Sequence, residues 1–187
     1  MGIKDMFFLD RNKAVLAVID IQEKLCRAMD PEVLAALTAN TTILLEAAKE
    51  LGLPVIATEQ YVKGLGETLE VLKSQLSAPA LEKMTFSCCG DENFVNALKA
   101  TGRTQVIVTG METHVCVLQT VLELLERDYR VHLVKDAVMS RRKDNWFIGV
   151  ETSRNAGATV TSTEAALFQL LRVAGTEEFK TLSKLVR

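Results

Sequence analysis

Residues 13–20 read KAVLAVID, an almost continuous apolar run that ends in a carboxylic acid. A strand buried on both faces of a parallel sheet has this composition, because neither of its faces meets water. We predict six such strands, the third on a weak pattern and the last as an edge strand: residues 13–19, 54–58, 81–84, 105–109, 130–134 and 158–160.

Segments with helical periodicity separate these runs. Between residues 32 and 51 apolar side chains recur at the spacing of one helix face, and Gly52 then ends the pattern. Further helices are predicted at residues 92–100, 113–127, 145–155 and 162–172. Alternating strands and helices indicate βαβ crossovers. The predicted fold class is therefore α/β, a three-layer α/β/α sandwich with a central, mostly parallel six-stranded sheet of Rossmann-like type. Residues 62–79 lack clear periodicity, and we expect them to reach over one edge of the sheet.

The composition is that of one compact domain. The chain has 187 residues, of which 48% are hydrophobic and 25% are charged, which excludes a disordered or fibrous protein. Because no linker is visible, we treat residues 1–187 as a single domain. The 22 basic and 24 acidic residues leave a net charge of −2, and the only basic cluster is at residues 141–143. We expect no nucleic-acid partner, since such binding usually needs a basic excess or stripe.

The apolar runs also bear on the location of the protein. None of them approaches the ~18–20 residues of a membrane helix, so we expect no membrane partner. The apolar residues 6–9 are too few for the core of a signal peptide. Four cysteines in a chain without an export signal indicate reduced thiols, and we expect a cytoplasmic protein. These cysteines are Cys26, Cys88, Cys89 and Cys116.

Three chemically active side chains stand at the carboxyl ends of predicted strands, where function collects in such folds: Asp20, Lys83 and Cys116. Cys116 lies near the start of a predicted helix, where free N–H groups and the helix dipole would favour its thiolate. A buried Asp20 needs a cationic or proton-donating partner. Taken singly, each residue also has an ordinary structural explanation: a packed thiol, a turn cap and a solvated lysine. Together they would supply a nucleophile, a base and an electrostatic clamp.

Three motifs carry a resemblance to a known family. The segments Asp20-Ile21-Gln22, Lys83 with Phe86-Ser87, and residues 110–117 (GMETHVCV) resemble, in order and spacing, the three signatures of the isochorismatase-like cysteine hydrolase superfamily. Nicotinamidases and other amidohydrolases belong to this superfamily. Residues 58–61 (TEQY) and 64–66 (GLG) further resemble its isochorismatase-domain-containing subgroup. The similarity spans roughly residues 14–171.

The resemblance implies a mechanism. Asp20 would take the thiol proton of Cys116, and Lys83 would hold both groups and lower their pKa values. The thiolate would then attack an amide carbonyl and cleave a C–N bond through an acyl-enzyme. The implied oxyanion hole consists of the backbone N–H groups of Glu112 and Cys116, after a cis peptide that maps to Met111–Glu112. A water activated by Asp20 would release the product.

The resemblance also bears on metals. Nicotinamidases bind a metal through an Asp and several His after the second strand, and the matching positions here are Gln60 and Val62. The chain has only two histidines, His114 and His132. A carboxamide replaces an anionic ligand poorly, so we predict no metal and no other cofactor. We interpret His114 as a packing or interface residue and His132 as a core histidine with its hydrogen bonds satisfied.

The expected substrate is a small molecule, and we expect the enzyme to be a homo-oligomer. The predicted pocket residues are Leu25, Tyr61, Phe86 and Trp146. Three alternatives stay open: isochorismatase-type ether cleavage, a catalytically silent oligomeric binding module, and a thiol redox sensor. The sensor would pair Cys116 with Cys88 or Cys89.

Overall fold

The computed structural model describes residues 2–186, so both end residues of the predicted domain lie outside the description. Six strands form one sheet in the order β3-β2-β1-β4-β5-β6, and every neighbouring pair is parallel. This confirms the predicted fold class, with a sheet that is fully rather than mostly parallel. The strands are β1 (Ala14–Ile19), β2 (Val55–Gln60), β3 (Leu81–Lys83), β4 (Gln105–Met111), β5 (Arg130–Met139) and β6 (Thr159–Thr161).

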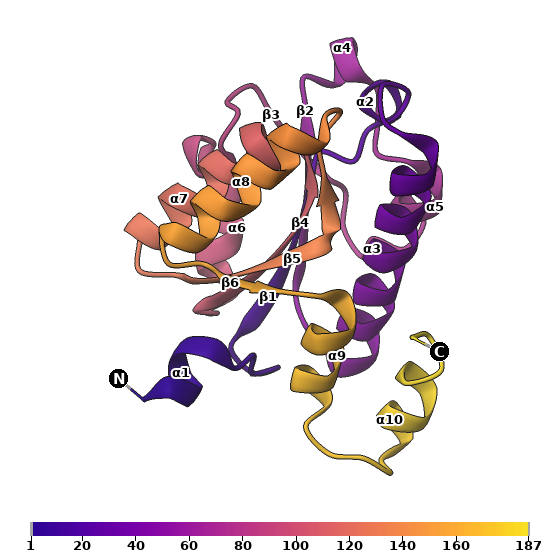
Figure 1. The fold of residues 1–187 in the computed structure, drawn as a ribbon, viewed down its shortest axis with the longest axis vertical. Helices are drawn as coiled ribbons and strands as arrows, with labels where there is room; N and C mark the ends of the chain where they lie inside the picture. The colour runs from indigo at the N-terminus through magenta and orange to yellow at the C-terminus, as the bar shows by residue number, and fades with distance from the viewer. Residues whose placement is uncertain (1, 187) are drawn as a thin grey trace.

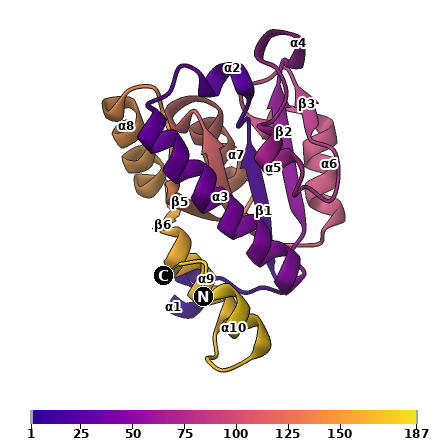
Figure 2. The same cartoon turned by 90° about the vertical axis from the view of Figure 1, so that its right-hand side faces the viewer.

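Helices cover both faces of the sheet and complete the three layers (Figures 1 and 2). Successive side chains of β1 point to opposite faces, so Leu16 packs in the core under α3 (Pro31–Leu51) and α9 (Thr163–Leu171). Val15 packs in the other core, which α6, α7 and α8 cover. These three helices span Glu92–Ala100, Leu118–Glu126 and Lys143–Asn155. Burial on both faces explains why the strands read as apolar runs in the sequence.

The long helix α3 has clear start and stop signals. The Asp30 carboxylate accepts hydrogen bonds from the backbone N–H groups of Glu32 and Val33, and Pro31 occupies the first helical position. The helix ends at Gly52, whose φ of 68° lies in the left-handed region that glycine adopts most easily. The predicted helix over residues 32–51 is therefore confirmed, one residue longer at its start.

The structure extends the predicted elements at several places. Strand β5 continues five residues past residue 134, and its pairing with β4 shifts register between Val108 and Gly110. The shift admits two exposed polar residues, Lys135 and Asp136, which end the apolar run without ending the strand. The predicted helix 113–127 begins with one turn of π-helix, η2 (Thr113–Val117), before α7.

The sequence analysis did not predict the short helices, because each has too few residues to show a helical periodicity. The segment 62–79 holds α4 (Val62–Leu65) and α5 (Glu70–Lys73). The other elements of this kind are α1 (Ile3–Phe7), α2 (Glu23–Cys26), the 3₁₀ turn η1 (Cys88–Gly90) and α10 (Glu177–Leu182). In the described part of the chain, no helix combines the length and the apolar character needed to cross a bilayer.

His132 is the third residue of β5 and is fully buried, as expected of a core histidine. Neither ring nitrogen has a hydrogen-bond partner among the described residues, so the expected satisfied hydrogen bonds are absent from residues 2–186. The register places it beside Ile107 of β4 and Thr159 of β6, in a mostly apolar layer. Burial, helped by the charge of Arg130, lowers its pKa from 6.5 to about 4. The neutral ring is thus the form that the fold accepts.

This pKa predicts a loss of stability in acid. Between pH 6.5 and about 4 the unfolded chain binds a proton at His132 that the folded chain does not, so the stabilisation present above pH 6.5 is lost as the pH falls. The shift corresponds to about 3 kcal/mol at most. We expect His132→Leu to remove this part of the decline and to stabilise the fold in acid. Urea unfolding at pH 6.5 and pH 4 measures it, and an unchanged decline in the variant would show that other groups cause it.

Candidate active site

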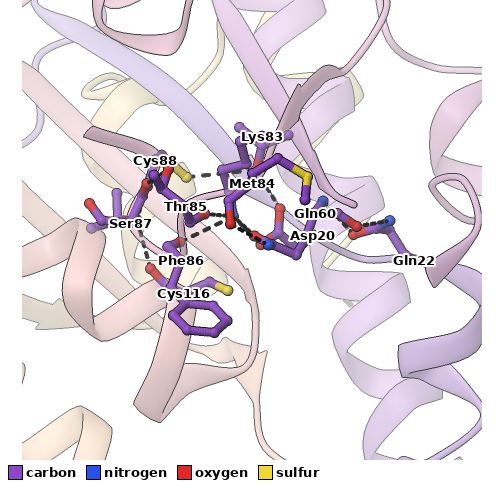
Figure 3. A network of polar contacts seen from close by, with 12 residues as sticks. Asp20, Gln22, Gln60, Lys83, Met84, Thr85, Phe86, Ser87, Cys88 and Cys116 are labelled. Atoms are coloured by element: carbon purple, nitrogen blue, oxygen red, sulfur yellow. Dashed lines mark hydrogen bonds and ion pairs between the residues drawn. The ribbon is translucent and has the colours of Figure 1, made fainter. Parts of the chain in front are cut away.

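The sheet order brings the three predicted catalytic residues to one edge. Asp20 directly follows β1, Lys83 ends β3, and Cys116 lies in η2, just after β4. The strands β3, β2, β1 and β4 are adjacent and parallel, so their carboxyl ends lie along the same edge of the sheet. Figure 3 shows the residues that meet there. Segments far apart in the sequence therefore form one polar cluster, as the strand-end rule predicts.

Asp20 and Lys83 form a buried ion pair. Lys83 Nζ lies 2.7 Å from Asp20 Oδ2, and the two side chains are 1% and 0% exposed for Lys83 and Asp20 respectively. The hydroxyl of Thr58 donates to the other carboxylate oxygen, Oδ1, at 2.8 Å. Asp20 adopts φ 51°, an unusual conformation for a residue other than glycine. Because both carboxylate oxygens accept charge-assisted or hydroxyl bonds, the orientation of the carboxylate is determined.

The remaining partners of Lys83 are neutral. Its ammonium group donates to Gln60 Oε1 at 2.8 Å and approaches the carbonyl oxygens of Thr85 and Phe86 at 3.2 and 3.1 Å. Burial acts to lower the pKa of Lys83, but the charge of Asp20, followed by the thiols of Cys88 and Cys116, raises it above the ordinary value overall. Lys83 is therefore a permanent cation of this site.

Cys116 is almost fully buried, and its thiol lies within electrostatic reach of Asp20 and Lys83. Burial and the Asp20 charge raise the pKa of Cys116 well above its ordinary range, although Lys83 acts to lower it. The expectation of a lowered thiol pKa is thus wrong for the resting site, because the carboxylate lies beside the thiol in a dry environment. The resting site therefore favours the protonated thiol over the thiolate.

Two glycines allow the segment around Cys116 to approach its neighbours. Gly110 has φ 119°, and a Cβ there would lie 2.0 Å from the carbonyl oxygen of Ile19 on β1. A Cβ at Gly149 of α8 would lie 2.7 Å from the carbonyl oxygen of Thr113 in η2. A larger residue at Gly110 would push the end of β4 away from β1, and a larger residue at Gly149 would push α8 away from η2. The predicted strand 105–109 stops just before Gly110, but the sequence has no signal for Gly149.

The residues before Cys116 are tied to the segment between β5 and α8. The Met111–Glu112 peptide bond is cis, where the resemblance places it. The Glu112 carboxylate accepts from the backbone N–H of Arg141 at 2.9 Å and from its Nε at 3.2 Å. The His114 ring contacts Ser140 Oγ through Nδ1 and Asn145 Nδ2 through Nε2, at 3.0 and 3.2 Å. Both ring nitrogens thus face residues 140–145, which supports a packing role for His114.

Thr120 and Cys88 belong to the cluster, and the sequence analysis did not place them there. The backbone N–H of Cys88 donates to Thr120 Oγ1 at 2.9 Å, and that hydroxyl donates to the carbonyl oxygen of Cys116 at 2.6 Å. Cys88 Sγ also lies 3.7 Å from the Thr58 hydroxyl. Burial raises the pKa of Cys88 to about 12. A threonine inside a helix carries no sequence signal for such a role.

The four predicted pocket residues do not share one cavity. Tyr61 and Lys83 line a cavity of about 420 Å³ at the outer edge of β3. Trp146 lines a different cavity of about 360 Å³ between α3 and β5. The Phe86 side chain is more than half exposed, and Leu25 packs against the core on the α3 side. Of the four, Tyr61 lines the cavity that contains Lys83.

The metal position of nicotinamidases does not fit this chain. The Gln60 carboxamide is engaged on both sides, by Lys83 Nζ and by the carbonyl oxygen of Met84. Val62 offers no ligand atom. Within residues 2–186, no group of three or more His, Cys, Asp or Glu side chains is arranged to hold a metal ion.

Comparisons with known sequences identify the family of the chain. A family model described as the isochorismatase domain matches residues 14–165. The secreted isochorismatase effector Isc1 of Phytophthora sojae is 41% identical over 183 residues, covering 94% of this chain and 85% of that protein. Isochorismatase domain-containing protein 2 of Xenopus laevis is 34% identical, with 95% and 85% covered.

Solved structures share the whole fold. The MAR1 ribonuclease of Caenorhabditis elegans has a TM-score of 0.89 at 36% identity, over 96% of this chain and 92% of that one. YcaC from Pseudomonas aeruginosa, solved with hexane-2,5-diol and covalent acrylamide, has 0.89 at 26% identity, over 99% and 93%. The Escherichia coli ycaC product, an octameric hydrolase of unknown specificity, has 0.87 at 27% identity, over 95% and 90%. Since the family model covers most of the chain and two relatives exceed 30% identity over nearly all of it, the chain belongs to the isochorismatase-like cysteine hydrolase superfamily.

Proposed function

We propose that the protein hydrolyses the C–N bond of a small carboxamide, with Cys116 as nucleophile, Asp20 as proton acceptor and donor, and Lys83 as electrostatic clamp. One observation carries the proposal: the buried Cys116 thiol lies within electrostatic reach of both Asp20 and Lys83, whose Oδ2 and Nζ atoms are 2.7 Å apart. A raised thiol pKa suits this scheme, because the proton needs to leave only when the substrate binds.

The steps follow from these contacts. Asp20 accepts the thiol proton while sulfur attacks the amide carbon, and Lys83 stabilises the developing thiolate charge. The backbone N–H groups of Glu112 and Cys116 would hold the oxyanion. Asp20 then returns the proton to the leaving nitrogen, which departs as ammonia or an amine. Asp20 next activates a water that attacks the thioester, so a carboxylic acid leaves and the thiol is restored.

The substrate class follows from chemistry and from one neighbour. The Pseudomonas aeruginosa protein was solved with covalent acrylamide, a small amide-bearing molecule that reacts with nucleophiles at its alkene, so it supports a small ligand rather than amide cleavage itself. Small primary amides are the class to test first, because their cleavage releases ammonia. Because Gln60 and Val62 offer no anionic ligand, we propose that hydrolysis proceeds without a bound metal. The net charge of −2 gives no support to RNA as a substrate, despite the name of the C. elegans structure.

The test measures ammonia release from a panel of small primary amides, together with the mass of the intact protein. We expect one amide to add its acyl group to the protein, with loss of ammonia, and peptide mapping to place the adduct on Cys116. Pretreatment with a chelator should leave the rate unchanged. An adduct on Cys88 or Cys89, or ammonia release that persists in Cys116→Ala, would contradict the proposal. A silent binding module would give neither signal.

We also propose that the protein is a homo-oligomer. Two adjacent apolar side chains of α8, Phe147 and Ile148, are each more than half exposed and offer an apolar surface that a second copy could cover. The octameric E. coli neighbour is consistent with this. A cytoplasmic location remains a prediction from the sequence, and the P. sojae relative is described as secreted.

A further inference from the structure

The Gln60 side chain is fixed between two residues of the β3 end. At 9% exposure it is buried, its Oε1 accepts from Lys83 Nζ at 2.8 Å, and its Nε2 donates to the carbonyl oxygen of Met84 at 2.9 Å (Figure 3). Because Oε1 can only accept and Nε2 can only donate, these two bonds allow one orientation of the carboxamide.

The backbone of Gln60 is held as firmly. Gln22 Oε1 accepts from the backbone N–H of Gln60 at 2.7 Å, and Gln22 Nε2 donates to the Gln60 carbonyl at 3.0 Å. The same Nε2 donates to the carbonyl oxygen of Gly66 at 2.6 Å. Gln22 is fully buried and lies two residues after Asp20. Gln60 therefore joins the chain that follows β1 to the ammonium group at the end of β3.

A single negative charge, that of Asp20, balances the positive charge of the Lys83 ammonium group. Among the hydrogen-bond partners of its ammonium group, Asp20 carries a charge, while Gln60, Thr85 and Phe86 offer neutral oxygens. The developing Cys116 thiolate depends on the positive field of Lys83, which acts to lower the pKa of the thiol. A second carboxylate at position 60 would compete for that cation and disfavour the thiolate.

We propose that Gln60 is a positioning residue for Lys83, and that its neutral carboxamide keeps the positive field of Lys83 available to the Cys116 thiolate. The inference rests on the proposed function, in which Cys116 is the nucleophile. The test measures only the reactivity of the Cys116 thiol, so its result can be interpreted even if the protein has no amidase activity.

The decisive variant is Gln60→Glu, because the protonated and the ionised forms of the glutamate side chain have nearly the same shape but differ in charge. When protonated, the new carboxylic acid can donate to Met84 and accept from Lys83, as glutamine does. Once ionised, it repels the Met84 carbonyl and shares Lys83 with Asp20. The rate of Cys116 alkylation by iodoacetamide should therefore be near that of the wild type in acid and fall at least about tenfold below it as the pH rises.

A matched control exists at the other end of the sheet. Gln105, the first residue of β4, is also buried, with Oε1 accepting from the Asp10 backbone N–H at 2.8 Å and Nε2 donating to the Phe8 carbonyl at 2.9 Å. Gln105→Glu removes the same kind of donor and adds the same charge, away from Lys83. We expect its alkylation profile to run parallel to that of the wild type.

Alkylation is followed over about pH 4 to 9, with peptide mass spectrometry to separate Cys116 from the other cysteines and circular dichroism to check folding. A Gln60→Glu profile parallel to the wild type, or the same new titration in Gln105→Glu, would overturn the proposal. If Gln60→Glu does not fold at neutral pH, Gln60→Met decides, because it removes both bonds and adds no charge. It should slow alkylation several-fold without a new titration, and an unchanged rate would refute the role of Gln60.

Discussion

Asp20→Asn should lower the rate of amide hydrolysis about a thousandfold and, at the same time, lower the pKa of Cys116. The carboxylate is the proton acceptor of the proposed reaction, so its loss removes the path for the thiol proton. Burial and the charge of the same carboxylate raise the pKa of the thiol, whereas Lys83 lowers it. Without Asp20, burial still raises this pKa, but the carboxylate charge no longer opposes the ammonium group.

The two effects have opposite signs, which makes the prediction specific. The pH dependence of iodoacetamide alkylation reports the thiol pKa, and the amide found in the panel reports turnover. Asp136→Asn is the matched control, because Asp136 Oδ1 accepts from the N–H and hydroxyl groups of Thr163 and does not contact Cys116. A higher thiol pKa in Asp20→Asn, or turnover that survives, would contradict the proposed arrangement.

Lys83→Met should lower the free energy of unfolding by about 3–5 kcal/mol at neutral pH. The substitution leaves the Asp20 carboxylate fully buried without its cation, with the Thr58 hydroxyl still donating to Oδ1. The desolvation of an unpaired charge is then uncompensated. Lowering the pH should relieve part of the loss, because a protonated Asp20 carries no charge. Hydrolysis should be lost as well, since the thiolate has no clamp.

Chemical denaturation measures this effect, and two comparisons sharpen it. Lys73→Met breaks an equally short pair, in which Lys73 Nζ lies 2.6 Å from Glu67 Oε2, but both side chains are largely exposed, so stability should change little. The double variant Lys83→Met with Asp20→Asn should recover part of the lost stability, because the uncompensated charge is gone. Equal losses of unfolding free energy in Lys83→Met and Lys73→Met would show that the buried pair stabilises the fold no more than the exposed pair does.

Much of the fold could be predicted because each buried strand carries its own signal. Residues 14–19 and 106–108 are apolar throughout, since both faces of the sheet are covered, and the structure places β1 and β4 there. The end of β5 could not be predicted, because its exposed Lys135 and Asp136 follow the irregular pairing with β4. Elements of four to six residues, such as α4 and α10, are too short for a periodic pattern.

The candidate site, like the fold, could be predicted from the sequence only in part. Asp20, Lys83 and Cys116 could be selected because each stands at a strand end or just after one, and parallel strands end at one edge. Thr58 and Gln60 also stand at or just after the end of a predicted strand, but their roles, like that of Thr120, depend on contacts with residues on other elements. The direction of the Cys116 pKa shift depends on which charge lies nearer in a dry environment, and residue spacing does not report that.

The amino-acid sequence by itself determined the α/β architecture and pointed to three candidate catalytic side chains, because these follow from local apolar patterns and from the common polarity of parallel strands. Only the tertiary structure decided which partner each charge has, and in which direction burial and charge shift the pKa of Cys116. Those properties arise from burial and from distances of a few ångströms between segments far apart in the chain, where small displacements change electrostatic energies strongly.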